Sequence, residues 1–399
     1  MPTIKGYYKS YFDVIDYPDL KFLPDSVDQS PEGTVNNRLR FVVDFRANGW
    51  LAATAAYDLS PRIKTANPDY ALAQSGGLRS PDYRISDPDR LIYPQSPDTA
   101  DGGFAIYQNL DRALLSVKLR YGDIYLGRQA IAWGSARVIN PTDIIAVFSF
   151  DELDIEDRPG VDAIRVISPL GLLGEIDAGY VFGHDFKFDE SAMFLRGRFN
   201  FRRNDLSLAA VGFRQNLLLG IDWTRPIRDA GFWMESAYVL AGFFDNDKRN
   251  SSDDYFRTSI GLDYSLKDGT YLFIEYHYNQ AGTNNPDKYL ALFDKTAYRD
   301  GAVFLLGKQY LTPGISRQIT PLITATGQVL INLTDPSAFF MPQLEYNIAE
   351  NIYLSAGAYF GLGQGPTYIS LFGNDIIPFP RSEFGTYPDF YFTSFRIYY

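Results

Sequence analysis

Polar and apolar residues alternate along most of this chain, and this alternation constrains the fold more than any other feature. In residues 194–202, for example, Arg196 and Arg198 fall on one face while Leu195 and Phe199 fall on the other. A period of two is that of a β-strand whose two faces meet different surroundings. Because similar segments recur over nearly the whole chain, the sequence predicts an all-β protein.

Counting these segments gives about eighteen strands, and most reach the roughly 9 to 11 residues that a transmembrane strand needs. The expected strands lie near 4–14, 36–46, 49–58, 105–121, 123–134, 161–168, 174–183, 192–202, 206–214, 217–226, 231–244, 255–267, 269–281, 307–318, 324–334, 338–348, 351–362 and 389–399.

The connections between these strands alternate between short and long. The short ones carry Gly, Asn, Asp or Pro turn chemistry and lie at 47–49, 121–123, 169–171, 203–205, 228–230, 267–269, 320–322 and 349–351. The long ones lie near 15–35, 59–104, 135–160, 184–191, 245–254, 282–306 and 363–388. This layout is typical of a transmembrane antiparallel up-and-down β-barrel, with tight periplasmic turns, long outer loops and both termini on the periplasmic side. We therefore expect one barrel domain over 1–399; a soluble sandwich or propeller, the alternative, gives no reason to sort loops by length.

Composition excludes several other classes. No stretch approaches the roughly 18 to 20 apolar residues of a membrane helix, although aromatic residues make up 16% of the chain. An excess of 48 acidic over 37 basic residues argues against nucleic-acid binding. The absence of Cys excludes disulfides, Cys-ligated zinc and covalently attached haem.

The two ends of the chain bear on its location. The N-terminus lacks the basic and apolar regions of a secretory signal, so the protein is either cytoplasmic or has lost its signal. The last residues, Phe390 to Tyr399, alternate and end on an aromatic residue. This ending resembles the C-terminal strand signal that the barrel assembly machinery recognises, which implies that machinery and outer-membrane lipid as partners. We therefore expect a bacterial outer-membrane location.

Two motifs add a resemblance to a particular kind of barrel. Residues Gly127-Arg128-Gln129 are followed by Trp133-Gly134, and then by Asn140-Pro141-Thr142-Asp143. This pattern resembles the GRQ-x-x-x-WG and N-P-T-D motifs of large, poorly characterised porin-like barrels of Gram-negative bacteria. Residues 311–363 are similar to the final strands of such proteins. The resemblance covers about a quarter of the chain and implies a porin without assigning a substrate.

In a barrel, the polar faces of the strands line the lumen, and their charges divide by position along the chain. The expected basic wall consists of Arg38, Arg40, Arg46, Lys118, Arg120, Arg165, Arg196, Arg198 and Arg202. The expected acidic wall consists of Asp222, Glu235, Asp263, Glu275 and Glu345. Such a transverse field sets charge preference in a pore. The alternative is that these charges pair with lumen neighbours and brace the barrel.

The connection near 135–160 carries the densest run of carboxylates in the chain. These are Asp151, Glu152, Asp154, Glu156 and Asp157. We expect this loop to fold inward opposite the basic wall and constrict the channel, with a solvated outer loop as the alternative. Clustered carboxylates can also bind calcium, but the spacing departs from an EF-hand loop and its central Gly is missing.

The remaining features point to no enzyme, metal or cofactor. His277 shares the inward face of its strand with Glu275 and lies near Ser259, but a lone His on such a face is usually a lumen residue rather than part of a catalytic site. The proline-rich connection 59–104 is either a lid over the mouth or surface loop. Gly-rich phosphate loops and zinc-ligand spacings are missing from the sequence.

Two functions are therefore compatible with the sequence. The first is an outer-membrane channel for small polar, anionic solutes. The second is a sheath that houses a multihaem cytochrome, which must then supply all the haem ligands because this chain has no Cys and only two His. The charged inward faces favour the channel; the oligomeric state is left open.

Overall fold

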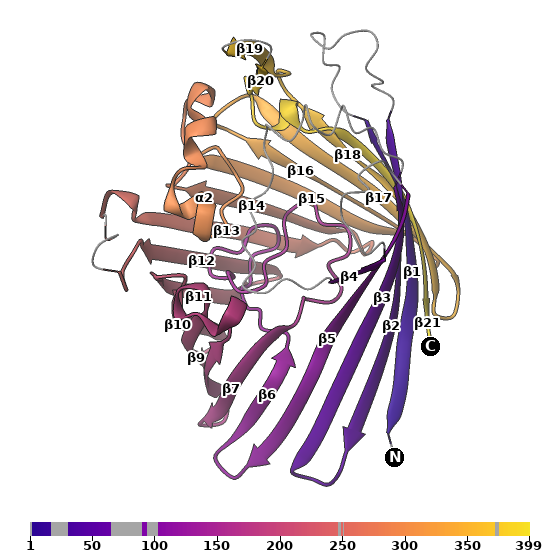
Figure 1. The fold of residues 1–399 in the computed structure, drawn as a ribbon, viewed down its shortest axis with the longest axis vertical. Helices are drawn as coiled ribbons and strands as arrows, with labels where there is room; N and C mark the ends of the chain where they lie inside the picture. Colours follow the sequence, from indigo (N-terminus) through magenta and orange to yellow (C-terminus); the bar gives the residue numbers. More distant parts are fainter. Residues whose placement is uncertain are drawn as a thin grey trace.

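The first and last strands pair with each other, so the sheet closes on itself (Figure 1). The computed structural model describes residues 2–16, 31–64, 90–93, 103–245, 249, 251–371 and 375–399. Within these residues one antiparallel sheet of 19 strands forms, and 18 of them make the wall, because the short β4 (Arg90–Tyr93) pairs only with β5. Closure leaves none of the 18 described wall strands at a sheet edge. The predicted all-β, up-and-down barrel is confirmed.

The wall strands follow one another around the barrel in sequence order. They are β1 (Thr3–Asp16), β2 (Glu32–Arg46), β3 (Leu51–Lys64), β5 (Gly103–Leu119), β6 (Gly122–Gln129), β7 (Val161–Leu170), β8 (Gly174–Val181), β9 (Ala192–Phe201), β10 (Asn204–Phe213), β11 (Asn216–Ile227), β12 (Ala230–Leu240), β13 (Tyr255–Ser265), β14 (Tyr271–Asn279), β15 (Gln309–Thr320), β16 (Ile323–Asn332), β17 (Ser337–Ala349), β18 (Ile352–Leu362) and β21 (Asp389–Tyr398). A separate hairpin, β19 (Thr367–Leu371) with β20 (Asp375–Phe379), lies in the connection before β21.

Among the described residues, one end of the barrel carries only short turns, and the other carries the long connections together with two short ones, 214–215 between β10 and β11 and 333–336 between β16 and β17. At the short-turn end, the Asn48 side chain accepts hydrogen bonds from the backbone N–H groups of Trp50 and Leu51 at 3.0 and 2.8 Å, which closes the β2–β3 turn. Both termini lie at this end, where Gly6 and Tyr399 exchange backbone hydrogen bonds of 2.9 and 3.0 Å. The predicted alternation of loop lengths therefore separates the two rims, except that the β10–β11 and β16–β17 connections on the long-loop rim are short.

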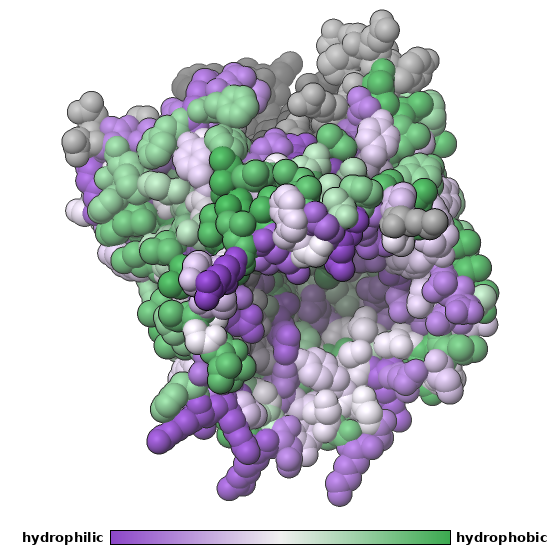
Figure 2. Space-filling view, turned by 90° about the horizontal axis from the view of Figure 1, so that it is seen from below, coloured by the Kyte–Doolittle hydropathy of each residue, from purple (hydrophilic) through white to green (hydrophobic). Residues whose placement is uncertain are grey.

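The outer face of the wall is apolar, as the alternation requires. On β9, Leu195 and Phe201 are 57% and 67% exposed, and similar exposed aliphatic and aromatic side chains recur on the other strands. Figure 2, seen from the short-turn end, shows hydrophobic side chains on the flanks around a hollow lined by polar ones. An apolar belt around a polar interior is the surface of a membrane barrel.

Helical segments occur only in the long connections of the described chain. They are η1 (His184–Phe186), η2 (Phe188–Glu190), η3 (Ser251–Asp253), η4 (Pro286–Lys288), η5 (Leu290–Leu292), α2 (Thr296–Asp300) and η6 (Phe384–Thr386). None of the helices among the described residues has the length and apolar character to cross a membrane.

Part of the lumen is filled by the chain itself. The 130–160 connection enters the barrel (Figure 1), and its Ile131, Trp133 and Ile145 join a buried cluster with Phe194 and Leu218 of the wall. The ring centroids of Trp133 and Phe194 lie 5.0 Å apart. The part of the lumen between the loop and strands β9–β13 is therefore a packed hydrophobic core.

Several strand ends differ from the sequence prediction, and the largest differences are at β3, which runs to Lys64 and not 58, and at β6. β6 ends at Gln129, five residues before the predicted end at 134, because the chain leaves the wall for the lumen after this residue. Within β6, Gly127 has a φ of +103° and a Cβ there would collide with the Ala113 carbonyl, so this position favours glycine. β5 and β9 end at Leu119 and Phe201. Of the predicted 59–104 connection, 65–89 and 94–102 lie outside the described residues, as do 17–30 of the predicted 15–35 loop.

Candidate functional site: the lumen constriction

The loop that crosses the lumen begins with the two sequence motifs, which the structure brings together. Trp133 donates its indole N–H to the carbonyl of Thr142 at 2.9 Å. Gly134 has a φ of +114°, and a side chain at this position would collide with Asn140 and Glu235. The WG and N-P-T-D motifs thus form one compact turn against the β12 wall.

Two carboxylates of the expected acidic wall hold the backbone of this loop. Glu235 of β12 accepts hydrogen bonds from the backbone N–H groups of Ser135, Ala136 and Thr142, at 3.0, 3.1 and 2.8 Å. Glu275 of β14 accepts them from Arg137 and Ile139, at 2.7 and 3.0 Å. Both carboxylates are buried. Hydrogen bonds to an ionised acceptor are the strong ones, so these two glutamates fix the path of the loop.

The other acidic-wall residues are also engaged. Asp222 accepts a hydrogen bond from the Ser135 hydroxyl. Asp263 accepts from the Arg137 guanidinium at 3.0 Å, and Glu345 of β17 pairs with Arg396 of β21, across the intervening strand β18. The acidic wall therefore serves largely to anchor the loop or to brace the wall.

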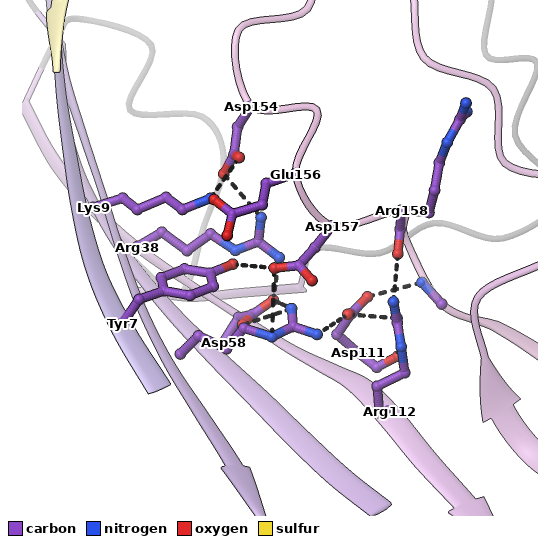
Figure 3. Close-up of polar contacts among 12 residues, drawn as sticks. Tyr7, Lys9, Arg38, Asp58, Asp111, Arg112, Asp154, Glu156, Asp157 and Arg158 are labelled. Atoms are coloured by element: carbon purple, nitrogen blue, oxygen red, sulfur yellow. Dashed lines mark hydrogen bonds and ion pairs between the residues drawn. The ribbon is translucent and has the colours of Figure 1, made fainter. Parts of the chain in front are cut away.

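The acidic run of the loop crosses to the opposite wall, at β1 and β2 (Figure 3). The Lys9 ammonium lies 2.7 Å from both Asp154 and Glu156, and its side chain is fully buried. Arg38 donates to Asp154 at 3.1 Å, and the Tyr7 hydroxyl donates to Asp157 at 2.7 Å. The loop thus spans the lumen from the glutamates on one wall to the cations on the other.

The two arginines that face this acidic run, Arg38 and Arg40, also pair with carboxylates of the barrel wall. Arg40 donates to Asp58 at 3.0 Å and to Asp111 at 2.6 Å, and Arg38 donates to Asp58 at 2.7 Å. Asp111 reaches this position through a bulge, where the β3–β5 register shifts between Ala56 and Tyr57. These guanidinium groups are therefore charge-compensated.

The remaining residues of the expected basic wall lie in different settings. Arg165 makes a bidentate pair with Asp177 at 2.8 and 2.7 Å. Arg196 donates to the Ser207 hydroxyl at 3.0 Å, and Arg198 lies 3.8 Å from Glu175. Four further members are exposed near the short-turn end: Arg46 and Lys118 at the ends of their strands, and Arg120 and Arg202 in the turns that follow β5 and β9.

Two cavities flank the loop. The larger, of about 890 Å³, reaches toward the short-turn end, where Asn351, Tyr353 and Arg396 line it. The smaller, of about 330 Å³, lies toward the long-loop end of β1, β2, β3 and β5. Four residues line both cavities: Tyr11, Phe148, Glu152 and Asp154. These four residues lie between the two cavities.

Burial and ion pairing shift the pKa values of two carboxyl groups in the loop. Burial raises the pKa of Asp143 to about 6, although Arg158 and Arg257 oppose this. Burial also disfavours the ionised form of Asp154, but Lys9 and Arg38 outweigh it and lower its pKa. Asp151 and Glu152 lie nearby; Asp151 accepts a hydrogen bond from the Ser149 hydroxyl.

Several residues of the site were missed from the sequence. They are Tyr7, Lys9, Asp58 and Asp111. The alternation that assigned Arg38 inward also places Lys9 inward, since Phe12 and Val14 of the same strand face outward at 51% and 43% exposure. A pattern alone does not show which cations meet which carboxylates.

His277 and Ser259, the pair considered for catalysis, lie buried beneath the loop. The Ser259 hydroxyl donates to the carbonyl of Ile139 at 2.6 Å and lies 2.8 Å from His277 Nδ1. The pair thus supports the loop. In the described part of the chain no cluster of three or more His, Cys, Asp or Glu forms a metal-binding arrangement.

The fold is that of solved outer-membrane porins. OccAB2 of Acinetobacter baumannii superimposes with a TM-score of 0.59 at 9% identity, over 100% of this chain and 98% of that one. A BenF-like porin of Pseudomonas fluorescens Pf-5 gives 0.55 at 9% identity, over 100% and 98%. The outer membrane protein opdK of Pseudomonas aeruginosa gives 0.54 at 8% identity, over 100% and 99%. The sequence matches no protein-family model, and no curated protein matches it. The likeness shows a shared closed barrel of 18 antiparallel strands.

Proposed function

We propose that this protein is a bacterial outer-membrane channel for small polar solutes. The observation that carries the proposal is the pair of cavities on opposite sides of the lumen loop, which share Tyr11, Phe148, Glu152 and Asp154. A narrow, charged passage inside a barrel with an apolar outer face is how a porin selects its solutes. The solved porins of the same fold, which are channels rather than enzymes, support the proposal.

Among the basic-wall residues that lie away from the short-turn rim, Arg196 and Arg198 have the loosest contacts with carboxylates, and they set the charge preference for small ions. Arg38, Arg40 and Arg165 have close carboxylate partners, whereas Arg196 and Arg198 have looser contacts. An anion preference, as expected from the sequence, would therefore come from Arg196 and Arg198. Glu152, at the constriction, acts in the opposite direction.

The sheath alternative requires a lumen wide enough for a second protein. Here the loop packs against β9–β13, and Tyr289, Leu292 and Tyr298 of the 282–306 connection join the same buried cluster. Because the loop and the 282–306 connection fill the lumen beside β9–β13, the remaining space suits small solutes better than a multihaem cytochrome. Outer-membrane lipid and the barrel assembly machinery remain the partners that we propose.

Because the chain has no Cys, one introduced cysteine tests the channel directly. Purified Glu152→Cys protein in planar bilayers should conduct, and a charged methanethiosulfonate reagent should then reduce its conductance by blocking the shared constriction. The control is Leu172→Cys in the β7–β8 turn, where Leu172 is 100% exposed and should react without changing conductance. Labelled Glu152→Cys protein with unchanged conductance would place the passage elsewhere, and an absence of conductance would refute the channel.

A further inference from the structure

The smaller cavity has a lining that is rich in neutral hydrogen-bonding groups. Asn36, Asn37, Ser60 and Asn109 line it, on β2, β3 and β5. Its volume of about 330 Å³ is at the lower end of the range for small-molecule sites. Amide and hydroxyl groups both donate and accept hydrogen bonds, so such a lining suits a ligand that does the same.

Asn109 has unused hydrogen-bonding capacity at this cavity. Its side chain is only 6% exposed, and its Oδ1 accepts no hydrogen bond from any described residue. A buried polar atom without a partner is costly, and native structures usually satisfy it. The neighbouring Asn37 differs, because it accepts from Tyr8 and Ser10 and donates to the Pro61 carbonyl. Asn109 Oδ1 is thus an unsatisfied acceptor beside the cavity; it is shielded from solvent, so a solute donor would satisfy it after a turn of the amide toward the cavity.

The charged groups around this cavity compensate one another. Four of the carboxylates that line it are Asp58, Asp111, Asp154 and Asp157. Four cations, Lys9, Arg38, Arg40 and Arg112, lie within 4 Å of them. Two further lining residues, Glu152 and Arg62, carry opposite charges. A balanced set of charges gives no strong net attraction for either sign of ion, but each ionised group still offers strong hydrogen bonds.

Aromatic rings lie at the inner end of the cavity. Tyr11 and Phe148 line both cavities, at the point where the smaller one meets the larger. A ring face offers apolar contact area to the C–H side of a solute whose hydroxyls bind the polar lining. The lining therefore combines acceptors, donors and apolar faces without an excess of charge.

We propose that this cavity is a binding subsite for neutral polyhydroxylated solutes, a sugar or polyol, with Asn109 Oδ1 accepting from one of the solute hydroxyls. The proposal rests on the channel function and names the class of solute that the channel recognises. It departs from the sequence-based expectation of anionic solutes, because the arginines nearest this cavity, Arg38 and Arg40, are neutralised by partner carboxylates.

The test uses the unmodified protein in planar bilayers and measures block of the ion current. Glucose should reduce the current in a saturable way, whereas tetraethylene glycol, which has few hydrogen-bond donors, should reduce it only as a bulk viscosity effect. Gluconate and glucosamine carry opposite charges on a similar skeleton, and neither should block more tightly than glucose. Equal effects of glucose and tetraethylene glycol, or tighter block by either charged analogue, would overturn the proposal.

Substitution then locates the subsite. Asn109→Leu should weaken the glucose block by about fivefold, as expected for one lost hydrogen bond, with Asn109→Ala as the second variant if the first does not insert. The matched control is Gln343→Leu, an amide that lines only the larger cavity, and it should keep the native glucose block. Native block in both Asn109 variants would overturn the assignment.

The two proposals fail in distinguishable ways. If the protein conducts but glucose never binds, the subsite is wrong and the channel stands. If the protein does not conduct, calorimetric titration of the detergent-solubilised protein with glucose still tests the subsite. Saturable binding that Asn109→Leu weakens would then support it, and no heat of binding would refute it.

Discussion

Glu235 accepts two hydrogen bonds from Thr142, one from the backbone N–H at 2.8 Å and one from the hydroxyl at 2.7 Å. The two residues are 93 positions apart, and one lies on a wall strand while the other lies in the loop that crosses the lumen. This pairing shows how the barrel uses inward carboxylates as fixed acceptors for the backbone of its own constriction loop.

Releasing the loop should widen the passage. The double variant Glu235→Ala with Glu275→Ala removes the acceptors of six backbone N–H groups, and each hydrogen bond to a charged group is worth roughly 1.5 to 3 kcal/mol. Single-channel conductance should rise and become noisier. Glu175→Ala, on a wall strand away from the loop, is the control. A folded double variant with native conductance would show that apolar packing alone holds the loop.

Lys9 should matter far more than Lys5. Lys9→Met leaves Asp154 and Glu156 without the cation 2.7 Å away, inside a buried network, and should destabilise the folded protein by about 3 kcal/mol. Lys5 pairs with Asp44 at the surface, with 60% of its side chain exposed, so Lys5→Met should cost under about 1 kcal/mol. Urea titrations of refolded protein in lipid vesicles would measure both. Equal effects would contradict the assigned role of Lys9.

Changing Arg196 and Arg198 together to Gln should lower anion preference and leave the barrel folded. Their outward neighbours Leu195 and Phe199, which face the membrane, are unchanged. The reversal potential across a salt gradient measures the effect, which should fade at 1 M salt, where the screening length is about 3 Å. Arg165→Gln is the contrasting variant, because it breaks the bidentate pair with buried Asp177 and should destabilise the barrel instead. Unchanged selectivity in the double variant would mean that another group sets the preference.

The stability of the long-loop rim should depend on pH through the carboxyl group of Glu383. This carboxylate, in the connection before β21, accepts from Tyr310 at 2.5 Å and Asn332 at 2.7 Å, and burial raises its pKa to about 7 from an ordinary value of 4.5. The folded state therefore binds the proton more tightly than the unfolded chain. The resulting stabilisation is complete below pH 4.5 and is lost as the pH rises through about 7.

Heat-modifiability on gels, measured from pH 4.5 to 8, checks this dependence. The midpoint of unfolding should fall over that range in the native protein and vary less in Glu383→Gln. The control, Glu350→Gln, changes a carboxylate in an exposed turn and should leave the native profile. A Glu383→Gln profile that matches the native one would contradict the assignment.

The orientation of the barrel in the membrane can be tested with antibodies on intact cells. An epitope tag in the exposed connection at residues 184–190 should be accessible to antibody, whereas one at Lys267 to Gly269 should require permeabilised cells. The two sites lie on opposite rims of the barrel. Equal accessibility at both would contradict the proposed orientation.

The sequence by itself determined the barrel. Alternation depends only on local residue order, because each strand must show one face to an apolar exterior and the other to a polar lumen, and the loop lengths sort the rims. The same pattern placed Arg38, Arg40 and Glu275 inward, and it contained enough information to place Lys9 as well.

Only the tertiary structure decided what the inward charges do. Glu235 meets Thr142, and Lys9 meets Asp154, across 93 and 145 positions of sequence, and these meetings depend on the register of many strands and on the path of the loop. Asp111 reaches Arg40 only because of a bulge opposite Ala56, which alternation does not reveal. The local sequence pattern sets whether a side chain faces the lumen or the membrane. The partner that the side chain meets, its burial and the space left open in the lumen depend on how the whole sheet closes around the loop.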